Sequence, residues 1–102
     1  MVTYPIRIRR ESYRGGDKRK KIRVANHNSQ VAELERYING LLLRQEAPIE
    51  VYDFADIARA GGFSLEFVSD VGYSIDGGSN GFTAWKHGMT HEQAMAANSR
   101  ND

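Results

Sequence analysis

The lysines and arginines are the side chains of this sequence best suited to binding a partner, and they are unevenly distributed. Nine of the fourteen fall between Met1 and Val24 against two acidic residues, so this segment has a net charge of +7. The rest of the chain carries five basic and eleven acidic residues, a net charge of −6. A basic segment on a mildly acidic body favours a polyanionic partner. The alternative is a solvated basic hairpin that binds nothing.

Other residues give weaker indications of chemistry. His87 and His91 are four residues apart, a spacing at which two histidines on one helix face can bind a metal. However, Gly88 lies between them and Thr90 is a good N-cap, which places His87 outside the helix. The glycine-rich segment 76–81 lacks the lysine and the following helix of a phosphate-binding loop. Because no Ser/His/Asp set or carboxylate pair stands out either, we expect no enzymatic activity, no metal and no cofactor.

The composition indicates one globular domain. The chain has 102 residues, of which 40% are apolar and 26% charged, and it has no cysteine. About 100 residues is the usual size of one domain, and the lack of cysteine excludes disulfide scaffolds, zinc fingers and iron–sulfur sites. The longest apolar run, residues 41–43, is far short of the roughly 20 residues that span a bilayer. With no apolar signal-peptide region at the start, we expect a soluble, cytoplasmic protein.

A basic β-hairpin is the first element predicted, over residues 1–25. Residues 3–13 alternate, with Tyr4, Ile6 and Ile8 on one face, as in a half-buried strand. A Gly-Gly-Asp turn at 15–17 leads to a second alternating run, and the basic residues gather at the tip of the hairpin.

A long helix is predicted over residues 29–46. Ser29 or the preceding asparagine can cap it, apolar residues follow at helical spacing, and Pro48 ends it. This helix carries more leucine than one small apolar face needs. It is therefore a candidate contact for a homodimer.

The remaining elements are predicted from caps and turn formers. Asp53 caps a helix over 54–60 that Gly61-Gly62 ends, and Ser64 caps another from Leu65 to about Val71 that Gly72 stops. Residues 73–86 indicate a hairpin around a glycine-rich loop. Thr90 begins a short last helix with Gln93 in a capping box. Together these elements predict an α+β fold.

Residues 54–73 resemble the helix-turn-helix of bacterial and phage repressors, over about one fifth of the chain. Ala58 stands where the family has a small residue between its two helices, and Gly62 stands at the family's turn glycine. Apolar residues at Phe54, Ile57, Phe63, Leu65, Val68 and Val71 would join the helices. The hairpin that follows resembles the wing of winged helix-turn-helix proteins. The resemblance implies one winged domain over 1–102, with the basic hairpin at 1–25, the long helix at 29–46, the helix-turn-helix at 53–73 and the wing at 73–86. A helical corner without a DNA role is the alternative.

The base-reading positions of the family fall on residues that depart from its pattern. They are Ser64, Glu66, Ser69, Asp70 and Tyr73, of which none is basic and two are acidic. A glutamate can accept a hydrogen bond from cytosine N4, but carboxylates near phosphates weaken binding, so the basic segment must supply most of the affinity. The predicted DNA interface comprises Arg7, Arg9, Arg14, Lys18, Arg19, Lys20, Lys21, Arg59, Ser64, Glu66, Ser69, Asp70, Tyr73, Asn80 and Lys86.

Two functions remain open at this point. The first is a small transcriptional regulator, a repressor that binds duplex DNA as a dimer. The second is a protein-binding winged-helix factor of a phage or mobile element, which engages a host nucleic-acid enzyme through its acidic helix. The basic segment favours the first, and the acidic second helix favours the other.

Overall fold

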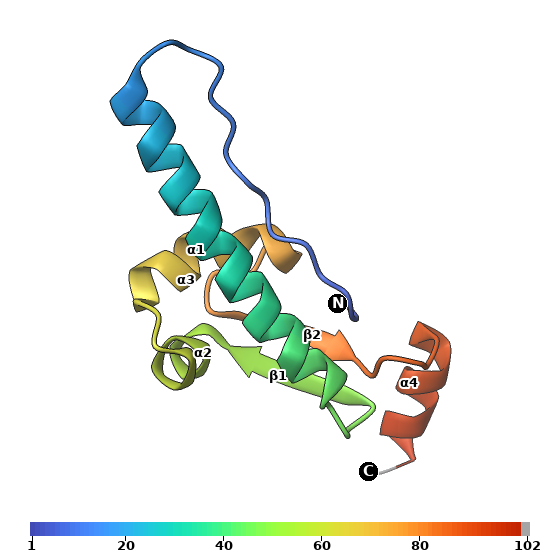
Figure 1. Cartoon of the computed structure of the whole chain (residues 1–102). Helices are drawn as coiled ribbons and strands as arrows, with labels where there is room; N and C mark the ends of the chain where they lie inside the picture. The colour runs from blue at the N-terminus through green and yellow to red at the C-terminus, as the bar shows by residue number, and fades with distance from the viewer. Residues whose placement is uncertain (101–102) are drawn as a thin grey trace.

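The computed structural model describes residues 1–100, which form four helices and a two-stranded antiparallel sheet (Figure 1). The α+β class is confirmed. In the part of the chain that the structure describes, no helix combines the length and the apolarity needed to cross a bilayer. The elements, in chain order, are α1 (Lys18–Leu43), β1 (Ile49–Asp53), α2 (Phe54–Gly61), α3 (Leu65–Asp76), β2 (Gly81–Trp85) and α4 (His91–Ser99).

The predicted hairpin over residues 1–25 is wrong. The chain before Lys18 is extended and pairs with no strand over most of its length, and residues 21–25 lie inside α1. Asp17 is the N-cap, and its carboxylate accepts hydrogen bonds from two backbone N–H groups of the first turn. This cap, together with lysines and arginines that propagate helices well, outweighs the alternation that suggested a second strand. The long helix therefore begins at Lys18 rather than at Ser29.

Residues 1–17, called the N-terminal arm below, run antiparallel along α1 (Figure 1). An extended chain needs partners for its backbone N–H groups, and here side chains on one face of a helix supply them. Asn39 accepts from Ile6 at 2.9 Å, Glu35 from Ile8 at 2.8 Å, and Asn28 from Glu11 at 2.9 Å.

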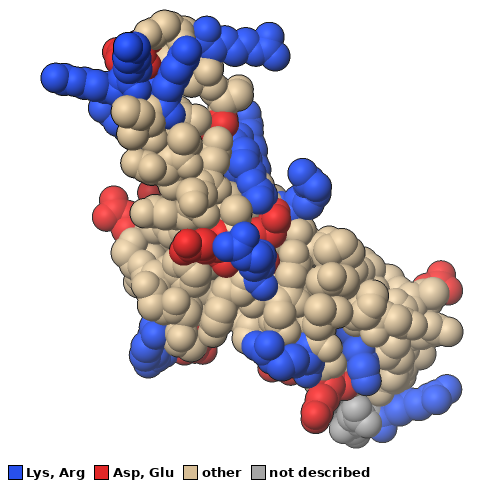
Figure 2. Space-filling view, viewed as in Figure 1, with Lys and Arg blue, Asp and Glu red and all other residues tan. Residues whose placement is uncertain are grey.

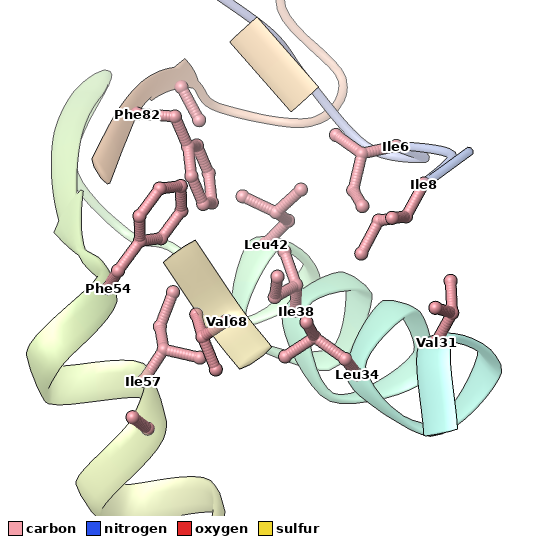
Figure 3. Close-up of a cluster of buried hydrophobic side chains, with 12 residues drawn as sticks. Ile6, Ile8, Val31, Leu34, Ile38, Leu42, Phe54, Ile57, Val68 and Phe82 are labelled. Carbon is pink, nitrogen blue, oxygen red and sulfur yellow. The ribbon is translucent and has the colours of Figure 1, made fainter. Parts of the chain in front are cut away.

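The core lies between the arm, α1 and the elements that follow (Figure 3). Ile6 and Ile8 of the arm are buried against α1, which explains why α1 has more leucine than one small face needs. The fully buried residues of α1 are Val31, Leu34, Ile38 and Leu42. Because they are packed within the same chain, they are not available for the dimer contact predicted on residues 29–46. Leu43, at 53% exposure, is the large apolar residue of that segment that stays at the surface.

The predicted wing at 73–86 is also wrong. The first half of that segment continues α3 as far as Asp76, and β2 pairs with β1 rather than with a neighbouring strand. Gly72 does not stop α3; it lies inside the helix, where a Cβ would sit 2.6 Å from the ring of Phe54. Phe82 of β2 instead stacks on Tyr52 of β1, with ring centroids 5.1 Å apart. Tyr52 and Phe82 are also register partners, so this contact between residues distant in sequence belongs to the β1–β2 pairing.

Several local predictions are confirmed. Asp53 caps α2, Ser64 caps α3, and Thr90 forms a capping box with Gln93 at the start of α4. Each of these signals is a side chain that hydrogen-bonds to backbone two or three residues away. Such contacts join residues that are close in sequence, so the sequence shows both partners.

Candidate nucleic-acid interface

Helices α2 and α3 meet at a corner of the kind expected from Ala58 and Gly62. Gly62 has φ +75, a left-handed conformation that favours glycine, and it ends α2. The N–H of Phe63 then donates to the carbonyl of Ala58 at 2.9 Å. Ala58 is buried at 5% exposure, and Val68 of α3 is fully buried. The corner thus fixes the direction of α3 and leaves its opposite face at the surface.

The exposed face of α3 is acidic and aromatic. Glu66, Asp70 and Tyr73 are exposed, and Ser69 is half-buried. Ser64 precedes them as the N-cap, with its Oγ accepting from the N–H of Phe67 at 3.1 Å. Within residues 1–100, neither carboxylate of this face forms an ion pair. The predicted base-reading residues therefore share one region of surface, with two uncompensated negative charges.

The N-terminal arm lies beside this face. The N–H of Arg9 donates to Oγ of Ser74 on α3 at 3.3 Å. Asp70 and Tyr73 line a groove together with Arg9 and His27, and an adjoining hollow is lined by Arg7, Arg9 and Ser74. Residues about sixty positions apart in sequence are thus brought together. Arg9 lines the same groove as Asp70 without forming an ion pair with it, and Arg7 lines the adjoining hollow.

Arg10 also lines the groove beside α3, and its guanidinium holds the arm in place. Its guanidinium makes two hydrogen bonds to the Glu35 carboxylate, at 2.6 and 3.1 Å. Arg10 hydrogen bonding is the main reason why the pKa of Glu35 is lowered. Glu35 stays ionised and continues to accept from the N–H of Ile8. The sequence analysis missed this clamp, although polar residues at spacings of seven and four on an otherwise apolar helix face are a signal for it.

A second group of cations lies at the far end of α1, at the top of Figure 2. We call it the basic tip: its members are exposed, and the acids near them are the capping Asp17 and Glu11, which lines a groove with Lys21. The first turn of a helix disfavours positive charge, because the macrodipole is positive there. Apart from the contact of Lys20 with the ring of Tyr13, at 5.9 Å from its centroid, no side-chain ion pair or cation–π contact within residues 1–100 offsets this unfavourable placement of charge. It consists of Arg14, Lys18, Arg19, Lys20, Lys21 and Arg23, the last of which was not predicted.

Three predicted interface residues lie elsewhere. Arg59 is on α2 and pairs with Asp56, one turn away. Asn80 precedes β2, and its carbonyl accepts from the N–H of Phe54 at 2.8 Å. Lys86 follows β2 and is half-buried. None of the three lines the groove between the arm and α3, so the structure does not bring them into the same site.

The two histidines considered for metal binding point to different partners. His87 lies outside α4, as predicted, and its ring meets the edge of Tyr4 with centroids 4.9 Å apart. His91 makes an edge contact with Trp85 at 5.1 Å. Within residues 1–100, no group of three or more metal-ligating side chains converges.

Comparison with known proteins gives no further assignment. No family model matches the chain, and no curated protein and no solved structure is detectably similar to it.

Proposed function

We propose that the protein is a small, cytoplasmic DNA-binding protein of the helix-turn-helix type, a transcriptional regulator that binds duplex DNA. In this proposal α3 enters the major groove, while the N-terminal arm and the basic tip contact phosphates. The observation that carries it is the arrangement of charge: cations of the arm lie directly beside the exposed face of α3, and the basic tip extends past that face along α1. Phosphate contacts supply most of the affinity of DNA-binding proteins.

The dimensions are compatible with this placement. The ring of His27 on α1 lies 6.0 Å from the ring of Phe67 on α3, which locates α3 beside the middle of α1. Lys18 is nine residues nearer the start of α1, a distance of about 14 Å along the helix axis. The major groove is about 12 Å wide. A helix in the groove would therefore have the basic tip close to one of the flanking backbones.

The acidic face of α3 has a specific role in this arrangement. Glu66 can accept a hydrogen bond from cytosine N4, which is a base-specific contact. Arg9 lines the same groove as Asp70 and would reduce the cost of bringing that carboxylate near phosphates, whereas Glu66 lies outside the groove. Affinity would then come from the arm and tip, and discrimination from α3.

A dimer on a palindromic site remains part of the proposal. Its contact cannot use the buried residues of α1, since the chain's own arm and core cover them. The apolar residues still available are exposed ones, among them Leu43 and Met95. The concentration dependence of sedimentation will show whether such a dimer forms.

The decisive experiment is a fluorescence titration of labelled random duplex DNA at several salt concentrations. Replacing Lys18, Arg19, Lys20 and Lys21 by alanine should weaken binding to all sequences alike and reduce the slope of log K against log salt by about 0.9 for each lost phosphate contact. Two double variants, each of which removes two positive charges, test whether the effect belongs to the tip. Lys18→Ala/Arg19→Ala at the tip should weaken DNA binding, and Arg36→Ala/Arg100→Ala away from the tip should not. Equal weakening by the two pairs would refute a role specific to the tip.

The protein-binding alternative makes the opposite prediction for α3. If its acidic face docks on a basic protein, Glu66→Ala and Asp70→Ala should each weaken that complex, and lysine at both positions should abolish it. If α3 enters the groove, Glu66→Ala should lose about 1–3 kcal/mol of discrimination at one base pair. A set of duplexes with single-base changes in a selected site measures this loss. Unchanged base preference in Glu66→Ala would show that α3 does not read bases in the major groove.

A further inference from the structure

The sheet has one open edge, and it belongs to β1. The other strand, β2, is paired on both sides: β1 flanks one side, and Val2 of the arm exchanges hydrogen bonds with Thr83 and Trp85 on the other. In Figure 1, β1 lies along the lower border of the molecule, between α2 and the loop that follows α1. Nothing within residues 1–100 pairs with that side.

The register identifies which backbone groups the open edge presents. Lys86 donates to the carbonyl of Pro48, and Phe54 donates to the carbonyl of Asn80, just outside the two ends of the ladder. Hydrogen-bonded pairs alternate with non-bonded pairs in an antiparallel ladder. Residues 50 and 52 therefore bond to β2, and the N–H and C=O of Val51 point away from the sheet. The centre of β1 is thus a free donor and acceptor for another strand.

A shallow apolar groove lies along the same edge. Its volume is 210 Å³, smaller than the roughly 300–1,000 Å³ of a typical small-molecule site, so it suits individual side chains better than a cofactor. Val51 is 72% exposed there, although it is an apolar residue in the middle of a strand. The groove is lined by Tyr37 and Leu41 of α1, by β1 from Val51 to Asp53, and by Asp56, Ile57 and Ala60 of α2.

The charge around this edge is negative. Glu50 and Asp53 are both exposed on β1, and neither forms an ion pair within residues 1–100. Asp56 is also there, paired with Arg59. Charged side chains on an edge strand hinder the pairing of like strands. The same charge favours a strand of opposite sign.

We propose that the open edge of β1 binds an extended segment of a partner protein in which apolar and basic residues alternate, adding it to the sheet as a further strand. Backbone hydrogen bonds to Val51 provide the register, as in other cases of strand addition. Apolar side chains of the segment face the groove at Leu41 and Ile57, and its basic side chains face the opposite side of the sheet, where the carboxylate of Asp53 lies beside Val51. A second copy of β1 fits less well, because it would bring two acidic strands together. This surface is separate from the proposed DNA interface, so either proposal can fail without the other.

The test uses a short fluorescein-labelled peptide of alternating lysine and valine, measured by anisotropy with the full-length chain. We expect this peptide to bind. A peptide of alternating glutamate and valine, and one with proline in place of each valine, should not bind, because they lack the charge or the backbone donors. Equal binding of the glutamate peptide, or no binding of the lysine peptide, would overturn the proposal.

A pair of variants at one position locates the contact. Val51→Pro removes the outward N–H without removing a bond to β2, since proline is tolerated on the free side of an edge strand. Val51→Thr keeps the N–H and the β-branched shape. We expect Val51→Pro to lower the affinity for the lysine–valine peptide at least about tenfold, and Val51→Thr to leave it nearly unchanged. Full affinity in a folded Val51→Pro variant contradicts strand addition.

A second measurement does not depend on the folding of Val51→Pro. In wild type, the peptide should shift the backbone amide NMR resonances of residues 49–53 and slow the exchange of the Val51 amide. Shifts confined to α3 or to the N-terminal arm would overturn the proposal. The proposal would also be overturned if wild type self-associates and Val51→Pro does not, because the edge would then bind a second copy of the chain.

Discussion

The α2–α3 corner and the N-terminal arm show two different ways of fixing a segment of chain. The corner is held by apolar side chains with no access to solvent, such as Phe54 and Val68. The arm buries Ile6 and Ile8, and is otherwise held by hydrogen bonds from its backbone to side chains of α1 and, at Val2, to the backbone of β2. The corner presents negative charge and the arm positive charge. The comparison indicates that the corner belongs to the global fold, while the arm can open separately.

The largest effect is expected from removing a ring at the corner. Phe54→Ala deletes a side chain that is 1% exposed and packs against Phe82 and Gly72. The free energy of unfolding should fall by about 3–5 kcal/mol, because of the cavity that remains. Urea denaturation followed by circular dichroism measures it. Tyr73→Ala is the control: it removes an aromatic ring from the exposed face of α3 and should change the free energy of unfolding by less than about 0.5 kcal/mol. A loss as large as that of Phe54→Ala would contradict the distinction between the buried side of the corner and its exposed face.

A smaller and local effect is expected in the arm. Glu35→Gln keeps an acceptor for the N–H of Ile8 but removes the charge that Arg10 binds. Hydrogen bonds to charged groups contribute about 1.5–3 kcal/mol, so the Ile8 amide should exchange with solvent tens of times faster, with little change in global unfolding. Hydrogen exchange by NMR gives the rate. Glu33→Gln, an exposed residue of the same helix, is the control, and equal rates in the two variants would show that the clamp does not hold the arm.

Acid should have the same effect as that substitution. The pKa of Glu35 is lowered in the folded protein, first by the hydrogen bond from Arg10. A group with a lowered pKa adds stability above its unfolded value, about 4.3 for glutamate, and this stability is lost as the pH falls through the folded pKa. Arm opening should therefore increase below about pH 4, in wild type but not in Glu35→Gln. The opening is measured as the exchange rate of the Ile8 amide at a series of pH values. If wild type and Glu35→Gln show the same pH dependence, the effect belongs to other carboxylates.

The smallest effect concerns the charge of the corner. Asp70 is exposed and lines the groove with Arg9. If α3 approaches phosphates, Asp70→Asn should tighten non-specific DNA binding by less than about 1 kcal/mol, since exposed charges interact weakly through water. Titration with random duplex at low salt is the measurement. Weaker binding in Asp70→Asn would mean that the carboxylate orients Arg9 rather than repelling DNA.

The parts of the fold that the sequence predicted correctly are those set by neighbouring residues. Asp53, Ser64 and Thr90 were identified as caps, and Gly62 as the turn between α2 and α3. Each depends on contacts within a few residues. Gly72 was misread, because its use is to admit the ring of Phe54, and that contact joins two helices.

For the candidate site, the sequence predicted which residues take part but not how they are arranged in space. The acidic residues of α3 and the cations of the first segment were identified, but their proximity through Arg9 and Ser74 was not. The clamp by Arg10 and Glu35 was also missed: the polar residues on the apolar face of α1 mark positions that need a partner, but the partner of Glu35 is 25 residues away in sequence. Arg59 and Lys86 were included for their charge alone, and the structure leaves them apart from the groove.

The sequence by itself determined the caps, the turn at Gly62 and the extended start of the chain, and the tertiary structure decided what each segment packs against and that residues 21–25 and 73–76 are helical. Alternation around Ile6 and Ile8 correctly predicts an extended chain with two residues turned inward, but its neighbour is the helix α1 rather than a strand. The reason is physical. Burial of apolar surface has no preferred direction, and a backbone N–H is satisfied equally by a strand or by an asparagine side chain. Only the folded chain shows that α1 offers such side chains at the right spacing, and that β2 lies beside β1.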